Sequence, residues 1–214
     1  MIIAAMVFDL DGVIVDSNQA IFDTYQQTAR IIGERVPSNE EVRKLLGQPS
    51  SINLKLLFGD NPQARPTYDQ VNPKTHANLP FLPHIRDVLK QMEVSKAIVT
   101  SKRLDHALEV LRDLRQFFSV IITPEQTTKQ KPNPEPLLLA CQKLNVDVQN
   151  VVYVGDTIRD YETARNAGAR FIGFVHDGAT SEEFRKAGAQ NTVTELNALP
   201  DLLKRLESKK KSDL

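Results

Sequence analysis

Residues 2–12, IIAAMVFDLDG, form a short apolar run that ends abruptly in two aspartates and a glycine. The run shows no polar alternation, which is typical of a parallel strand covered on both faces. The carboxylates of Asp9 and Asp11, at positions i and i+2, can point the same way while Leu10 points into the core. Gly12 then permits a sharp turn of the chain. The stretch therefore predicts a buried first strand that carries two acidic side chains to its carboxyl end.

Four more apolar runs resemble this first strand, which we place at Ile2–Phe8. They are rich in Val, Ile and Phe, and segments with helical spacing of apolar residues lie between them. Strands that alternate with helices predict a doubly wound α/β core of three layers, with a parallel sheet in the middle. The four further strands that we predict are Ala97–Thr100, Phe118–Ile122, Val151–Val154 and Phe171–Val175.

One long interval breaks this alternation. Between the first and second predicted strands the sequence contains no convincing strand, whereas Asn18–Ile32 has the apolar spacing of a helix. We expect a helical cap domain at residues 16–82, inserted after the first strand. Residues 1–15 and 83–214 would then form the core, and the two ends of the insert would lie next to each other.

Composition narrows the class of protein. The chain has 214 residues, and its single cysteine, Cys141, cannot form an internal disulfide, which favours a reducing compartment. Its 27 basic and 27 acidic residues cancel, so there is no electrostatic reason to expect a nucleic acid or an anionic membrane as partner. No apolar run approaches the roughly 20 residues of a membrane helix, and the apolar start lacks the basic leader of a signal peptide. We expect a cytoplasmic enzyme or binding domain whose oligomeric state stays open.

Polar residues gather where the predicted strands end, which is the edge at which open α/β sheets bind ligands. Thr100, Ser101 and Lys102 follow the second strand, and hydroxyl and N–H groups before a helix can hold a small anion. Asp156 and Asp160 follow the fourth strand and lie about one helical turn apart.

A further candidate is Lys131, which begins the proline-rich segment KPNPEP. Prolines stiffen a loop and would fix where this lysine points. Each of these patterns also has an ordinary structural explanation by itself: a polar turn, a helix cap, an exposed lysine, or charges that complement a helix dipole.

Taken together, the patterns predict a metal and phosphate site. Asp9, Asp11, Asp156 and Asp160 would place up to four negative charges at one end of one sheet, where they repel one another. A hard divalent cation offsets that repulsion, and Mg²⁺ typically binds a few carboxylates together with water and a phosphate oxygen. Lys131 and Thr100 would then contact the anionic phosphoryl group.

At this point a family resemblance is plain. The strings DLDGVIVDS (9–17), IVTSK (98–102), KPNPEP (131–136) and VYVGDTIRD (152–160) resemble, in the same order, the motifs of the haloacid dehalogenase superfamily of phosphatases. The resemblance covers about residues 6–190 and implies a Rossmann-like core. The helical insert is similar to that of the branch that contains phosphoglycolate phosphatases, pyrophosphatases and beta-phosphoglucomutases.

The resemblance implies catalytic roles for three residues. Asp9 matches the nucleophile that forms an aspartyl-phosphate, and Asp11 matches the general acid and base. Lys131 matches the lysine that neutralises charge and orients the nucleophile.

Binding roles follow from the same motifs. Thr100, together with the backbone N–H groups of Leu10 and Ser101, would hold the transferring phosphoryl group. The implied cofactor is Mg²⁺, and its ligands would be Asp9, the Asp11 backbone carbonyl and Asp156, with Asp160 supporting directly or through water.

The function implied is that of a Mg²⁺-dependent phosphatase acting on a small phosphorylated metabolite. A phosphomutase and an inorganic pyrophosphatase are the alternatives. In the mutase branch a cap histidine lies about twelve residues after the nucleophile, and Ile21 stands at that position here, which favours hydrolysis. In the cap, Arg43 and Lys44 either meet an anionic substrate or belong to a solvated helix face. The four histidines show no metal-ligand spacing, and we assign them no role.

Overall fold

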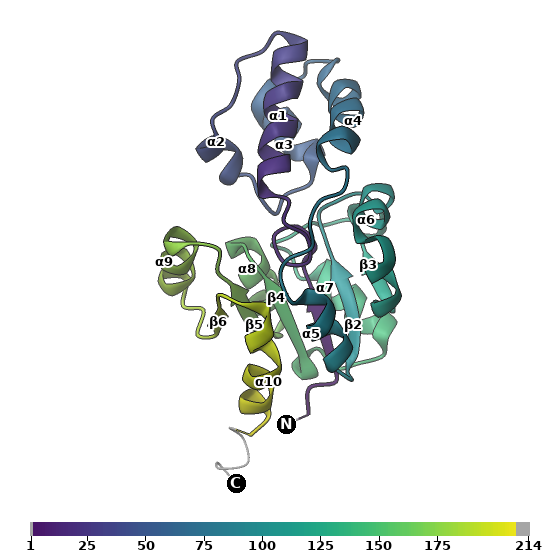
Figure 1. Cartoon of the computed structure of the whole chain (residues 1–214), viewed down its shortest axis with the longest axis vertical. Coiled ribbons are helices and arrows are strands. Elements are labelled where there is room, and N and C mark those ends of the chain that lie inside the picture. The colour runs from purple at the N-terminus through teal and green to yellow at the C-terminus, as the bar shows by residue number, and fades with distance from the viewer. Residues whose placement is uncertain (1, 209–214) are drawn as a thin grey trace.

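A parallel β-sheet forms the centre of the core in the computed structural model, which describes residues 2–208 (Figure 1). Within those residues the sheet has six strands in the order β3-β2-β1-β4-β5-β6, and all neighbouring pairs are parallel. The strands are β1 (Ala5–Phe8), β2 (Ser95–Val99), β3 (Val120–Ile122), β4 (Val151–Gly155), β5 (Arg170–Phe174) and β6 (Thr192–Val193).

All five predicted strands are present, and the predicted fold class is confirmed. The first strand begins later than predicted, at Ala5 instead of Ile2, because both of its neighbours begin opposite Ala5. The sixth strand, β6, was missed because a strand of two residues has no readable periodicity.

Helices cover both faces of the sheet, and the alternation of side chains along β1 sends residues to each face. Met6 and Phe8 pack with the helices on one face, whereas Ala5 and Val7 pack with those on the other. The first face is covered by α5 (Ile85–Gln91), α6 (Leu104–Leu111) and α10 (Leu199–Ser208). The second face is covered by α7 (Glu135–Leu144), α8 (Ile158–Ala167) and α9 (Gly178–Ala187). Short 3₁₀ helices lie at Arg112–Phe117, Pro124–Gln126, Val148–Asn150 and Leu196–Ala198.

A group of four helices follows β1 and stands over the carboxyl edge of the sheet (Figure 1). The helices are α1 (Asn18–Ile32), α2 (Asn39–Arg43), α3 (Ser50–Phe58) and α4 (Ala64–Thr75). They enclose an apolar cluster of their own, which contains Phe22, Tyr25, Leu54, Phe58 and Tyr68 among others. We call this group the cap.

The chain enters and leaves the cap along two adjacent segments. The N–H of Asp16 donates to the carbonyl of Pro80 at 2.9 Å, and the N–H of Leu82 donates to the carbonyl of Ile14 at 3.0 Å. The ends of the insert therefore lie side by side, as an insertion requires. The limits that we assigned to it, 16–82, stay a prediction, and residues 1 and 209–214 of the predicted core lie outside the described part.

No helix within residues 2–208 combines the length and the apolar composition that crossing a membrane requires.

Candidate active site

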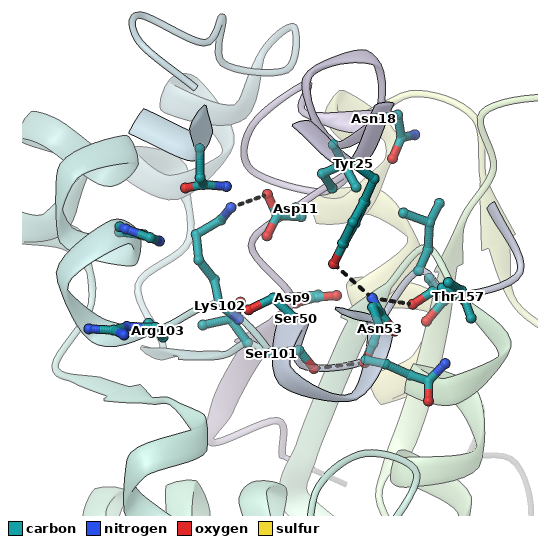
Figure 2. A pocket seen from close by; sticks show the side chains of 18 of the residues that line it. Asp9, Asp11, Asn18, Tyr25, Ser50, Asn53, Ser101, Lys102, Arg103 and Thr157 are labelled. Carbon is teal, nitrogen blue, oxygen red and sulfur yellow. Dashed lines mark hydrogen bonds and ion pairs between the residues drawn. The ribbon is translucent and has the colours of Figure 1, made fainter. Parts of the chain in front are cut away.

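The site lies where the central strands end. Because β2, β1 and β4 are neighbours in the sheet, the loops that follow them meet over its middle. The loop after β1 carries Asp9 and Asp11, the loop after β2 carries Thr100, and the loop after β4 carries Asp156. A cavity opens between these loops and the cap, and Figure 2 shows Asp9 and Asp11 beside it.

Lys131 contacts two of the predicted carboxylates. Its Nζ lies 2.9 Å from Asp9 Oδ2 and 2.7 Å from Asp160 Oδ1, and all three side chains are buried. Burial alone would lower the pKa of Lys131, but the charges of Asp160 and Asp9 raise it, so the ammonium keeps its proton. Burial raises the pKa of Asp9 well above its ordinary value, and Lys131 opposes that shift.

Both carboxylate oxygens of Asp160 accept hydrogen bonds from neighbouring groups. Its Oδ1 accepts from Lys131 Nζ and from the Tyr153 hydroxyl at 2.9 Å. Its Oδ2 accepts from the Thr157 N–H at 3.1 Å and from the Thr157 hydroxyl at 2.6 Å, in a capping box at the start of α8. Both oxygens therefore already have two donors each.

Three carboxylates could hold a metal ion. Asp9, Asp156 and Asp160 each offer an oxygen, and these atoms lie within 4.8 Å of one another. Asp156 Oδ1 is buried and has no hydrogen-bond partner, and burial raises the pKa of this carboxyl. An unpaired oxygen beside the Asp9 carboxylate fits a hard cation such as Mg²⁺, which prefers oxygen ligands.

His176 supports this cluster, although the sequence analysis gave it no role. Its Nε2 lies 3.2 Å from Asp156 Oδ2. Burial alone would lower the pKa of His176, but the hydrogen bond and charge of Asp156 raise it. His176 follows β5 by two residues, so the strand-end rule that selected the other site residues also applies to it.

Asp11 pairs with a second lysine, Lys102, for which the sequence predicted no role. Lys102 Nζ lies 3.2 Å from Asp11 Oδ1, as the dashed line in Figure 2 marks. Burial raises the pKa of Asp11, but the charge of Lys102 lowers it, and the net shift is downward. Asp11 is therefore ionised at neutral pH.

Of the predicted phosphate-binding groups, Thr100 and Ser101 lie at the cavity, whereas the Leu10 N–H is engaged with Asp9. Thr100 and Ser101 line the cavity, and the Ser101 hydroxyl donates to the carbonyl of Gly47 in the cap at 2.7 Å. The Leu10 N–H instead donates to Asp9 Oδ1 at 2.8 Å. The side chain of Leu10 is buried in the core, as predicted.

The two basic cap residues of the sequence analysis do not line this cavity. Arg43 pairs with Asp177 of the core at 2.9 Å, and Lys44 pairs with Glu40 on the cap surface at 3.1 Å. The Arg43 pair is therefore a bridge between cap and core.

A family model described as haloacid dehalogenase-like hydrolase matches residues 6–174. The chain belongs to this family. The match covers most of the chain and confirms both the resemblance and the prediction of an enzyme that hydrolyses phosphoric esters.

Individual members of the family are similar over most of the chain. A phosphorylated carbohydrates phosphatase of Thermotoga maritima is 30% identical over 93% of this chain and 99% of its own length. The pyrophosphatase PpaX of Oceanobacillus iheyensis is 31% identical over 79% of this chain and 82% of its own. The solved structure of beta-phosphoglucomutase from Clostridium difficile is similar in fold, with a TM-score of 0.78 at 22% identity over 93% of each chain.

Proposed function

We propose that this haloacid dehalogenase-like hydrolase is a Mg²⁺-dependent phosphatase that acts on a small phosphomonoester. The observation that carries the proposal is the surroundings of Asp9. One of its carboxylate oxygens contacts Lys131, and the unpaired Oδ1 of Asp156 belongs to the same cluster. Phosphoryl transfer needs a nucleophile, a positive charge beside it and a carboxylate that can bind a metal ion. Here Asp9, Lys131 and Asp156 would fill these roles.

Asp9 is the nucleophile in this proposal. Its carboxylate attacks phosphorus, the bond to the leaving oxygen breaks, and an aspartyl-phosphate forms, which divides one difficult displacement into two. Lys131 fixes the orientation of Asp9 and balances its charge. Water then attacks phosphorus, the bond between phosphorus and the Asp9 oxygen breaks, and phosphate leaves while the Asp9 carboxylate is regenerated.

Asp11 moves the protons. Because Asp11 is ionised at neutral pH, it must first take up a proton from solvent, which it then gives to the leaving oxygen in the first step; in the second step the carboxylate takes a proton from the attacking water. The lowered pKa of Asp11 supports the second role, because the carboxylate is the form that accepts a proton.

Mg²⁺ is the proposed cofactor, and it would supply positive charge between the nucleophile and the phosphoryl group. Asp9, Asp156 and the Asp11 backbone carbonyl would hold it. Asp160 would support it through water and through its neighbours, because four hydrogen bonds already occupy its oxygens. Thr100 and the N–H group of Ser101 would hold the phosphoryl group. The Leu10 N–H donates to Asp9 Oδ1 in this structure, so it would join them only after that bond opens.

Release of phosphate from an aryl phosphate tests the proposal. The protein should release phosphate with Mg²⁺ and not in excess chelator, and Asp9→Asn should abolish turnover while the chain still folds. Asp87→Asn, at an exposed position of α5, is the matched control. Full activity in chelator would contradict the metal assignment, and near-normal turnover by Asp9→Asn would contradict the nucleophile.

The phosphomutase and the pyrophosphatase remain the alternatives. Ile21, at the position of the mutase histidine, lines the cavity and cannot transfer a proton, which favours hydrolysis. Incubation with beta-glucose 1-phosphate, with and without its bisphosphate, distinguishes a phosphomutase from a phosphatase. Glucose 6-phosphate formed faster than free phosphate would show a mutase.

A further inference from the structure

Within residues 2–208, no charged side chain belongs to the wall of the cavity that the cap contributes. Among the described residues, the cap side of the cavity is lined only by neutral ones. They are Asn18, Ile21, Tyr25, Leu45, Leu46, Gly47, Gln48, Ser50, Asn53, Tyr68 and Asn72. The leaving group of the substrate would face this wall, because the opposite wall holds Asp9 and Asp11.

Two pairs of side chains form a polar surface on this wall. Asn53 Nδ2 donates to the Tyr25 hydroxyl at 3.1 Å, and Asn72 Nδ2 donates to the Tyr68 hydroxyl at 3.2 Å. The two tyrosine rings lie 5.2 Å apart between their centroids, so the two pairs are neighbours. Figure 2 shows Tyr25 and Asn53 projecting from different helices and joined by their hydrogen bond. We call these four residues the amide–tyrosine cluster.

The cluster holds an unused acceptor. Asn53 is 4% exposed, and its Oδ1 has no hydrogen-bond partner. The amide orientation is fixed, because Nδ2 also donates to the carbonyl of Leu45 at 3.2 Å. A buried acceptor without a partner is unfavourable, and a hydroxyl group of a ligand would satisfy it.

The cations at the cavity are already paired. Lys102 contacts Asp11 at 3.2 Å, and Arg103 contacts Asp105 at 3.0 Å. On the cap wall, a carboxylate or a second phosphate in the leaving group would meet only neutral side chains, and burial of a charge against them is unfavourable. On the core side, Lys102 is buried and already paired with Asp11, whereas Arg103 belongs to a half-exposed surface pair.

We propose that the amide–tyrosine cluster binds the hydroxyl groups of a neutral leaving group. The preferred substrates are then monophosphates of sugars or polyols, in preference to pyrophosphate or phosphoglycolate. The inference rests on the proposed phosphatase function and names the substrate class of the same site.

The selectivity of the wild-type protein gives the first test. Phosphate release is measured at one Mg²⁺ concentration from hexose 6-phosphates, pentose 5-phosphates, glycerol phosphate, pyrophosphate and phosphoglycolate. The kcat/KM of the best polyol phosphate should exceed that of pyrophosphate and that of phosphoglycolate, whose leaving groups are charged, by at least about tenfold. A higher kcat/KM for pyrophosphate or phosphoglycolate would overturn the inference and leave the phosphatase proposal intact.

The second test uses Asn53→Ala, with Ser51→Ala as an exposed control on the same helix. The ratio of kcat/KM for the best polyol phosphate to that for p-nitrophenyl phosphate, which has no hydroxyl groups, should fall about tenfold in Asn53→Ala. The fall should come from a raised KM, and the ratio should not change in Ser51→Ala. An unchanged ratio in folded Asn53→Ala would overturn the inference. If none of the esters were hydrolysed in a way that depends on Asp9, the proposed phosphatase function itself would be wrong.

Discussion

Lys131 Nζ lies 2.7 Å from Asp160 Oδ1, and the two side chains are 2% and 0% exposed. The same ammonium contacts Asp9, so one buried cation is shared by two carboxylates. Loss of one member of a buried ion pair leaves the other charge uncompensated, which typically costs about 3–5 kcal/mol. Lys131 is therefore a determinant of stability as well as of the position of Asp9.

Lys131→Met should reduce the free energy of unfolding by about 3 kcal/mol and abolish phosphate release. Urea unfolding measures the first effect, and a phosphate-release assay measures the second. Lys129→Met, in the same loop and exposed, is the control and should change neither quantity. A variant at Lys131 with an unchanged unfolding midpoint would show that the ion pairs contribute no net stability.

Mg²⁺ should stabilise the folded chain through Asp156. The buried Oδ1 of Asp156 lacks a partner, and a bound cation would supply one. At a concentration 100 times its dissociation constant, a ligand that binds only the folded state stabilises it by about 2.7 kcal/mol. The melting temperature should therefore rise with Mg²⁺ in the wild type and not in Asp156→Asn, whereas Asp87→Asn should behave as the wild type. An equal rise in the wild type and Asp156→Asn would exclude Asp156 as a ligand.

The core and its two central acidic residues were predictable because Asp9 and Asp156 each come where an apolar run ends. Asp9 and Asp156 leave buried strands, and parallel strands bring their carboxyl ends to one edge. Lys131 was selected from its proline-rich loop, but its role beside Asp9 came only from the resemblance, since a loop lysine carries no signal for which carboxylate it contacts. Its contact with Asp160 joins residues 29 positions apart in the sequence.

Side chains that support the site from apolar elements were not predictable. Tyr153 lies in the middle of β4 and looks like an ordinary strand residue, yet its hydroxyl donates to Asp160. Asn53 and Asn72 lie in cap helices, and their inward orientation depends on how α1, α3 and α4 pack together. Helical periodicity locates apolar faces, but it does not identify which polar residues lie buried between helices.

His76 should make stability depend on pH in the acid range. Burial lowers the pKa of this cap histidine to about 4, against 6.5 ordinarily, and Lys102 lowers it while Asp11 opposes the shift. As pH falls, His76 of the unfolded chain takes up a proton near pH 6.5, whereas His76 of the folded chain stays neutral until about pH 4. Protonation therefore favours the unfolded chain, and the free energy of unfolding decreases as pH falls from about 6.5 to about 4. The loss should be on the order of 3 kcal/mol.

Urea unfolding at pH 7 and pH 5 checks this dependence against His76→Gln. The other histidines and the acidic residues titrate in both proteins and cancel in the comparison, except for Asp11, whose charge acts on His76. The wild type should lose more stability than His76→Gln between the two pH values. Parallel losses would show that His76 titrates normally in the folded chain.

Gly12 should tolerate no side chain, for two separable reasons. Its φ of +74° lies in the left-handed region, where a residue with a Cβ costs roughly 1–2 kcal/mol. A Cβ at Gly12 would also collide with the carboxylate of Asp156. Gly33 has nearly the same φ, +73°, but a Cβ there meets no atom within 4 Å. Comparison of alanine substitutions at Gly12 and Gly33 therefore separates the effect of backbone strain from the effect of displacing Asp156.

Gly33→Ala should lose roughly 1 kcal/mol of stability and keep its activity, because only the backbone is strained. Gly12→Ala should lose more stability, and its kcat for an aryl phosphate should fall about 100-fold, because a displacement of about 1 Å at a catalytic centre has an effect of that size. Its stabilisation by Mg²⁺ should also weaken, since Asp156 can no longer keep its position. Equal kcat values for the two alanine variants would mean that the contact between Gly12 and Asp156 does not set the position of the metal ligand.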